Sequence, residues 1–266
     1  MMGCKSSALL ESLAEMLTGS GAAALLLFEL TDATAFAGGL SRSAHIAALC
    51  AASAAVGGGI ALLRARGAQG RSRVLLYAGA AAVALALLEA ILLIAHLGGW
   101  GLTLCAWGAI AAATVALATL SGAMARAGRL RGLVLASVSL YGGSLWLVFA
   151  AAVENARYRA VVSDPVAELA PLLPFEAVSF LFLALAGTMQ VFDYARLGTP
   201  SAAERTRRYV AATLLFAVPL LVLGADVHAP ALMVLAPLSG MCGFLAARAP
   251  RLDRVEAEPP TVLGLQ

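Results

Sequence analysis

Charge is scarce in this sequence. Only 12% of its 266 residues are Asp, Glu, Lys or Arg, whereas 61% are hydrophobic. Soluble domains are typically about 25% charged and about 45–50% apolar, so the composition excludes an ordinary soluble domain. A membrane-spanning helix needs roughly 20 apolar residues, and several such spans would use most of this chain.

Residues that usually hold metals or cofactors are also few. The chain has four cysteines and three histidines, and their spacing matches no metal-ligand motif. We expect free, buried thiols and no iron–sulfur cluster held by this chain. Haem fits poorly, because only His45, His96 and His228 could form a ligand pair, although all three lie near outer ends of predicted spans.

Two further classes are excluded by what is missing. No basic stripe carries interleaved aromatic residues, which excludes nucleic acid as a partner. Gly-rich phosphate loops, nucleophile elbows and zinc motifs do not occur either, so the sequence does not indicate a soluble-type enzyme.

Eight Ala- and Leu-rich segments remain, without the alternation typical of β-strands. We expect them to span the membrane as helices, because a helix satisfies its own backbone hydrogen bonds in lipid. The sequence thus predicts an all-α, polytopic membrane protein, with residues 1–250 as a transmembrane helical bundle and 251–266 as a disordered cytoplasmic tail. The predicted spans are residues 8–30, 42–64, 73–96, 101–124, 131–154, 171–195, 208–225 and 229–248.

Basic residues occupy alternate loops between these spans. The loops on one side of the membrane carry 15 of the 18 Lys and Arg residues. The loops on the other side carry the remaining three, Arg42, Arg157 and Arg159. The positive-inside rule assigns the more basic side to the cytoplasm, which places both termini there. We therefore expect a multi-pass protein of the bacterial or archaeal inner (cytoplasmic) membrane, with the lipid bilayer as a partner.

Glycine and proline predict local features of the spans. The runs Gly57-Gly58-Gly59 and Gly142-Gly143 should let helices approach closely. Pro219 and Pro237 lie inside the last two spans and should kink them. The longest outer loop is expected at Asn155–Ala170.

Glu89 is the strongest candidate for a functional residue. A charge inside a bilayer costs several kcal/mol, so ionisable residues in membrane spans usually serve a function. Glu89 lies in the third span between Leu85–Leu88 and Ile91–Ile94. His96 follows two turns later, on the same helix face and about 10 Å nearer the outer surface. A carboxylate and an imidazole so placed suit proton transfer at a quinone headgroup. The alternative is a buried Glu89 bonded to a Ser, Thr or Arg of another helix.

Other polar residues map to the same outer half of the membrane. The candidate quinol and proton residues are Glu89, His96, Trp100, Glu154 and Glu176; no catalytic residue and no metal ligand is predicted. Trp100 can equally belong to an aromatic belt with Trp107 and Trp146. Glu29 and Asp32 end the first span, where we expect them at the membrane interface.

Several segments then suggest a family. A helix ending in Ala61-Leu62-Leu63-Arg64 is followed by a basic loop, and the next helix ends in His96-Leu97-Gly98. Ala106-Trp107-Gly108-Ala109 lies in the following helix, and Leu172–Gly187 follows a long outer loop. This order resembles the quinol-oxidising membrane anchors of molybdopterin oxidoreductases, of the dimethyl sulfoxide reductase and polysulfide reductase (DmsC/NrfD-like) type. Gly99-Trp100 replaces the Arg/Ser-Pro that follows His-Leu-Gly in that family.

The resemblance implies a divergent anchor subunit of a multisubunit respiratory oxidoreductase. The share of this chain in the enzyme's reaction would be, at most, the binding of quinol. The resemblance also implies iron–sulfur and molybdopterin-type subunits as partners, and menaquinone or ubiquinone as a ligand near the outer face. Two alternatives stay open. One is a structural or assembly subunit of a larger membrane complex without chemistry of its own, and the other is a small-solute transporter, toward which only Pro219 and Pro237 point.

Overall fold

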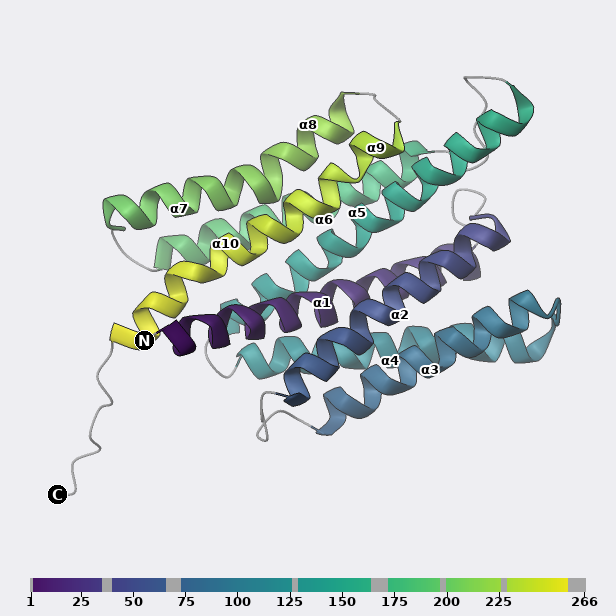
Figure 1. The fold of residues 1–266 in the computed structure, drawn as a ribbon, viewed down its shortest axis with the longest axis horizontal. Helices are drawn as coiled ribbons and strands as arrows, with labels where there is room; N and C mark the ends of the chain where they lie inside the picture. Colours follow the sequence, from purple (N-terminus) through teal and green to yellow (C-terminus); the bar gives the residue numbers. More distant parts are fainter. Residues whose placement is uncertain are drawn as a thin grey trace.

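The chain forms a bundle of long helices (Figure 1). The computed structural model describes residues 2–34, 40–65, 73–125, 129–163, 172–196, 200–225 and 229–257. Within these segments there is no strand, and eight helical spans are long and apolar enough to cross a membrane. The prediction of an all-helical, multi-pass membrane protein is therefore confirmed.

The helices follow the predicted spans closely, with extensions at a few ends. The first six spans are α1 (Met2–Ala33), α2 (Arg42–Ala65), α3 (Arg73–Ile94), α4 (Trp100–Ala125), α5 (Arg129–Val162) and α6 (Leu172–Arg196). The seventh combines α7 (Ala202–Ala212), the π-helical turn η2 (Thr213–Ala217) and α8 (Val218–Gly224), and the eighth combines α9 (Pro230–Met233) and α10 (Leu235–Ala257). Because α10 continues to Ala257, it includes the first part of the predicted tail, and residues 258–266 lie outside the described segments.

Helix α1 lies at the centre of the bundle. It contacts α2, α4, α5 and α10, and it is the most deeply buried of the eight spans found in the described segments. Successive spans alternate in direction, so α1 begins and α10 ends at the same end of the bundle (Figure 1). We call this the terminal end and the opposite one the far end; the charge pattern predicts that the far end faces outward.

Two glycines allow α1 to approach its neighbours closely. A Cβ atom at Gly143 of α5 would lie 2.7 Å from the backbone nitrogen of Ala24, and one at Gly59 of α2 would lie 2.7 Å from that of Thr18. Backbone atoms cannot rotate aside as a side chain can, so both crossings require glycine. Gly57 and Gly58, in contrast, face open space, so the predicted close packing holds for only part of that run.

The fifth helix is longer than the sequence predicts. Asn155, expected to begin a loop, is helical and only 1% exposed. The helix ends at Val162, and Ser163 adopts a φ of +58°, the left-handed conformation common after a helix C-terminus. The rest of the predicted loop, residues 164–170, lies outside the described segments.

The predicted irregularities at Pro219 and Pro237 are present. Leu215, four residues before Pro219, lies in η2, and Met233, four residues before Pro237, is the last residue of α9. Proline has no N–H to bond the carbonyl four residues earlier, and its ring displaces that carbonyl. Each proline therefore interrupts α-helical geometry one turn before its own position.

Candidate functional site

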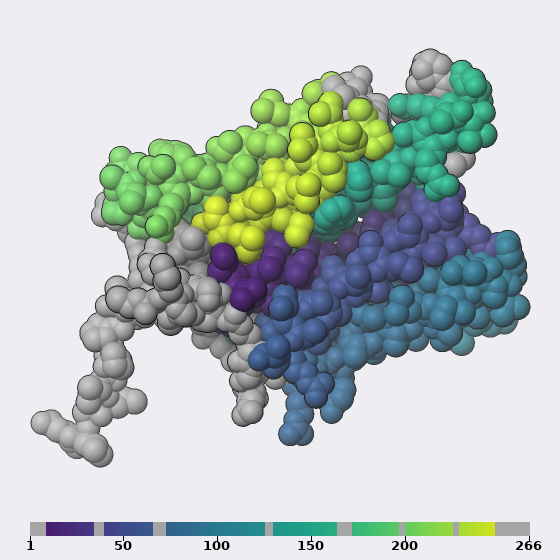
Figure 2. Space-filling model, viewed as in Figure 1, coloured from purple at the N-terminus to yellow at the C-terminus, as the bar shows by residue number. Residues whose placement is uncertain are grey.

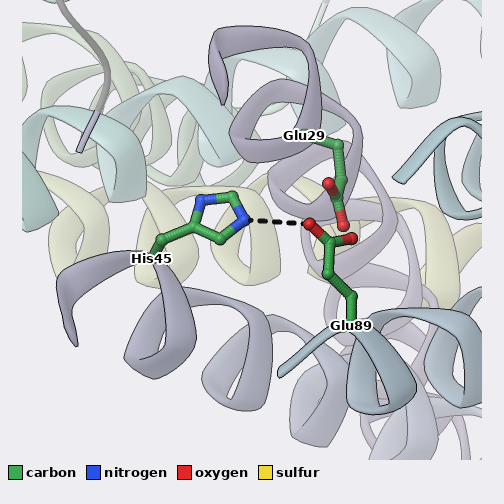
Figure 3. A group of neighbouring side chains, drawn as sticks. All are labelled: Glu29, His45 and Glu89. Carbon is green, nitrogen blue, oxygen red and sulfur yellow. Dashed lines mark ion pairs between the residues drawn. The ribbon is translucent and has the colours of Figure 1, made fainter. Parts of the chain in front are cut away.

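Three ionisable side chains from three helices meet near the far end of the bundle. They are Glu29 of α1, His45 of α2 and Glu89 of α3, which we call the Glu–His–Glu cluster (Figure 3). Nε2 of His45 lies 3.5 Å from Oε1 of Glu89, and one ligand-type atom from each residue lies within 4.8 Å of the other two. Both carboxylates are fully buried, and His45 is 3% exposed.

The position of each residue along its helix brings the cluster together. Glu29 lies four residues before the end of α1, His45 three residues after the start of α2, and Glu89 five residues before the end of α3. Helices α1, α2 and α3 are successive antiparallel spans that contact one another. Similar offsets therefore place the three side chains at one level, roughly 5 Å or one helical turn below the far end.

With both carboxyl groups ionised, the cluster would carry more negative than positive charge. Both oxygens of Glu29 and Glu89, and Nε2 of His45, lack a hydrogen-bond partner among the described residues. A protonated His45 would neutralise one carboxylate and leave the other uncompensated, which costs several kcal/mol in a membrane. The arrangement can therefore hold at least one additional cation, either a proton shared by the two facing carboxyl groups or a metal ion.

Glu89 belongs to this cluster, but His96 does not. Helix α3 ends at Ile94, and His96 adopts a φ of +56°, so the helical periodicity that aligned it with Glu89 stops before it. Its Nδ1 instead accepts a hydrogen bond of 2.6 Å from Nη1 of Arg42, on the exposed surface. A guanidinium can only donate, which fixes the direction of this bond. The predicted alignment of Glu89 with His96 is therefore wrong.

Trp100 and Glu176 also lie apart from the cluster. Trp100 is the first residue of α4 and is 85% exposed on the outside of the bundle, a position that suits the aromatic-belt alternative. Glu176 is buried on α6, which packs against α5. Neither side chain is part of the group formed by α1, α2 and α3.

Glu154 has a defined structural partner. Its two carboxylate oxygens accept hydrogen bonds from the backbone N–H of Ser41, at 2.8 and 2.9 Å. Ser41 immediately precedes α2, so the carboxylate meets one of the free N–H groups at the positive end of that helix. This bond joins the far part of α5 to the start of α2 and holds the Glu154 carboxylate in place.

Glu154 also lines a cavity of about 370 Å³ between α1, α2 and α5. On α2 the wall is a row of alanines from Ala44 to Ala55, and on α5 it includes Trp146 and Phe149. These two aromatic rings pack edge to face, with centroids 5.8 Å apart. The charged groups of the lining, Glu154 and Arg157, both come from the far part of α5. The molecular surface recedes between α2 and α5, below α10 (Figure 2).

Sequence reasoning missed Glu29 and His45 as site residues. Glu29 was expected at the interface with Asp32, but it is fully buried, because the surrounding helices cover α1 even near its end. The matching offsets of Glu29, His45 and Glu89 from their helix ends are the signal that could have found the cluster. His228, the third histidine considered for haem, lies outside the described segments.

The far end of the bundle thus holds two candidate sites, the Glu–His–Glu cluster and the cavity that ends at Glu154. The two sites share no residue, since none of the cluster residues lines the cavity. No family model, no curated protein and no solved structure matches this chain.

Proposed function

We propose that this chain is the membrane anchor subunit of a multisubunit respiratory oxidoreductase and that it binds quinol in the cavity between α1, α2 and α5. The observation that carries the proposal is the combination of apolar walls with two charged groups at one end of that cavity. Ligand cavities typically measure about 300–1,000 Å³ and combine apolar walls with a few polar groups. The volume of about 370 Å³ suits a quinone ring and the first part of its tail.

The shape of the cavity supports a ring-and-tail ligand. Its alanine wall extends from Ala44 to Ala55, roughly 16 Å at a rise of 1.5 Å per residue. A quinol ring at the Glu154 end would bring a hydroxyl group to the carboxylate, with the guanidinium of Arg157 as a hydrogen-bond donor. Trp146 and Phe149 offer aromatic surface for packing, and the isoprenoid tail would follow the alanines toward the lipid.

Glu154 is suited to take a proton in this reaction. Oxidation of quinol to quinone releases two electrons and two protons, and a general base must lie within hydrogen-bond reach of the hydroxyl group. The two bonds from the Ser41 N–H fix the carboxylate and leave its other lone pairs for a ligand. We assign it the first proton and assign the second to water at the far end of the bundle.

The two electrons need an acceptor in another subunit, because the cysteines of this chain form no cluster-binding motif. The family resemblance of Ala61–Gly99 implies iron–sulfur and molybdopterin-type partners, which would supply that acceptor. Menaquinone or ubiquinone would be the donor. The partners and the direction of electron flow rest on the resemblance, whereas the binding site rests on the cavity.

Binding of a quinol analogue to the purified full chain tests the site. A fluorescent hydroxyquinoline N-oxide is titrated into the protein in detergent, and quenching reports binding. Ala51→Phe places a large side chain in the cavity and should weaken binding at least about 10-fold. Ala54→Phe is the matched control, because Ala54 lies on the same helix, is exposed and does not line the cavity. Equal affinities of the two variants, or no binding by the native chain, would contradict the proposal.

Purification from native membranes tests the complex. Co-purification of subunits that contain iron–sulfur clusters or molybdenum would support the anchor function. If such subunits co-purify but the native chain binds no quinol analogue, the chain is a structural or assembly subunit. Solute uptake by proteoliposomes that contain only this chain would instead favour the transporter.

A further inference from the structure

We propose that Glu29, His45 and Glu89 bind one divalent transition-metal ion, such as Zn²⁺ or Mn²⁺, and that this ion ties α1, α2 and α3 together at the far end. The three side chains converge from three helices (Figure 3). The metal site is independent of the quinol proposal, because none of its residues lines the cavity beside Glu154.

The distances match metal coordination. Zinc binds imidazole nitrogen at about 2.0–2.1 Å and carboxylate oxygen at about 2.0–2.2 Å, so two ligands at a tetrahedral angle lie about 3.4 Å apart. Nε2 of His45 and Oε1 of Glu89 are 3.5 Å apart. The Glu29 oxygen lies within 4.8 Å of both, and small rotations of its flexible side chain bring it closer.

Charge and burial favour a divalent cation. Two carboxylates and a neutral imidazole carry a charge of −2, which one divalent ion cancels. A single shared proton would leave a charge of −1 while His45 is neutral, so protons alone neutralise the group only if His45 is protonated as well, whereas one divalent ion does so by itself. The ion would also satisfy ligand atoms of Glu29, His45 and Glu89, which lack hydrogen-bond partners among the described residues. This group differs from a surface cluster of acidic residues in two ways. Its ligand atoms are buried without hydrogen-bond partners among the described residues, and they come from three different helices and point at one position.

The ligand set narrows the choice of ion. Imidazole suits Zn, Fe, Cu and Ni, whereas carboxylates suit Mg, Ca and Mn. A set with both types favours Zn²⁺ or Mn²⁺ over Mg²⁺ or Ca²⁺, and three protein ligands leave a further position for water. The exposed Asp32, whose charge acts on Glu29, would attract cations to the far end, roughly one helical turn from the site.

The test uses the full chain in detergent, stripped with a chelator and titrated with Zn²⁺ or Mn²⁺. Calorimetry and elemental analysis after gel filtration should show one ion per native chain. Glu89→Gln and His45→Ala should each weaken binding at least about 100-fold, since loss of a direct ligand exceeds the 10–100-fold effect of outer-shell changes. Glu176→Gln is the matched control, because Glu176 is also a buried carboxylate near the far end and should leave binding unchanged.

Two measurements separate loss of the site from loss of the fold. Zn²⁺ should raise the unfolding temperature of the native chain but not of the Glu29→Gln/Glu89→Gln double variant, whose helices should remain folded because glutamine removes the buried charge. X-ray absorption of the Zn²⁺-loaded chain should show imidazole scattering that is lost in His45→Gln. If the folded native chain binds neither ion better than the double variant does, protons alone neutralise the cluster and the proposal is overturned.

Discussion

Replacing Gly143 with alanine is expected to destabilise the contact between α5 and α1, whereas the same change at Gly142 is not. At Gly143 the added Cβ would lie 2.7 Å from the backbone nitrogen of Ala24 and 2.8 Å from the carbonyl carbon of Ala23. At Gly142 the nearest atom is the Cβ of Ser20 at 3.4 Å, an ordinary van der Waals distance. The two variants differ by one position on one helix, so they add the same methyl group to different surroundings.

The expected magnitude follows from these distances. At Gly143 the helices must separate by about 0.7 Å to restore contact at 3.4 Å, since 3.4 minus 2.7 is 0.7. Forcing a methyl group into packed structure costs about 1–3 kcal/mol. Alanine is favoured over glycine inside a helix by about 0.5–1 kcal/mol, and this gain applies to both variants and cancels in their difference. Gly143→Ala should therefore be about 1–3 kcal/mol less stable than Gly142→Ala.

The free energy of unfolding can be compared in detergent micelles by titration with a denaturing detergent, followed by circular dichroism. The native chain serves as the reference, and Gly142→Ala should be as stable as the native chain or slightly more stable. If the two variants agree within about 0.5 kcal/mol, the close approach of α5 to α1 at Gly143 does not stabilise the bundle, and the argument from glycine packing fails.

Two further predictions concern the far end. Glu154→Ala removes the acceptor of the Ser41 N–H and should cost about 0.5–2 kcal/mol of unfolding free energy, as loss of a helix cap does. Glu154→Gln keeps a carbonyl oxygen and should lose less in the same titration, and equal losses would speak against a capping role. For orientation, Gly98→Cys in a cysteine-free chain should react with a membrane-impermeant maleimide on intact cells, because Gly98 adjoins open space at the far end. Ser201→Cys, at the start of α7 near the terminal end, should react only after lysis, and the opposite pattern would reverse the assigned orientation.

Hydropathy predicted the ends of the spans well where charged residues flank them. The second span was expected at 42–64 and α2 covers Arg42–Ala65, while the third was expected at 73–96 and α3 covers Arg73–Ile94. The end of α5 was missed because a helix that continues beyond the apolar run leaves no hydropathy signal. Asn155, Arg157 and Arg159 interrupt the apolar run, yet packing buries Asn155 and the helix persists to Val162.

The candidate site was predictable only in part. Glu89 stands out because an isolated carboxylate in an apolar run is costly unless neighbouring helices accommodate it. Its partners could not be identified from periodicity, since His96 lies beyond the end of α3. Glu29 and His45 each resemble ordinary interfacial residues in sequence. Only the packing of α1 against α2 and α3 shows that they face Glu89.

The central position of α1 has a consequence for how the protein enters its membrane. This helix has the lowest mean hydropathy of the eight spans recognised in the described segments, and it leaves the ribosome before α2, α4, α5 and α10, which surround it. Its buried polar side chains are Ser12, Glu15, Thr18, Ser20, Glu29 and Thr31. The hydroxyl groups of Thr18, Ser20 and Thr31 donate to carbonyls of α1 itself, but the carboxyl groups of Glu15 and Glu29 would face acyl chains at considerable cost if α1 stood alone in lipid. We therefore expect α1 to insert as a hairpin with the more apolar α2. The side of α1 that packs against α5 stays uncovered by protein until α5 has been synthesised.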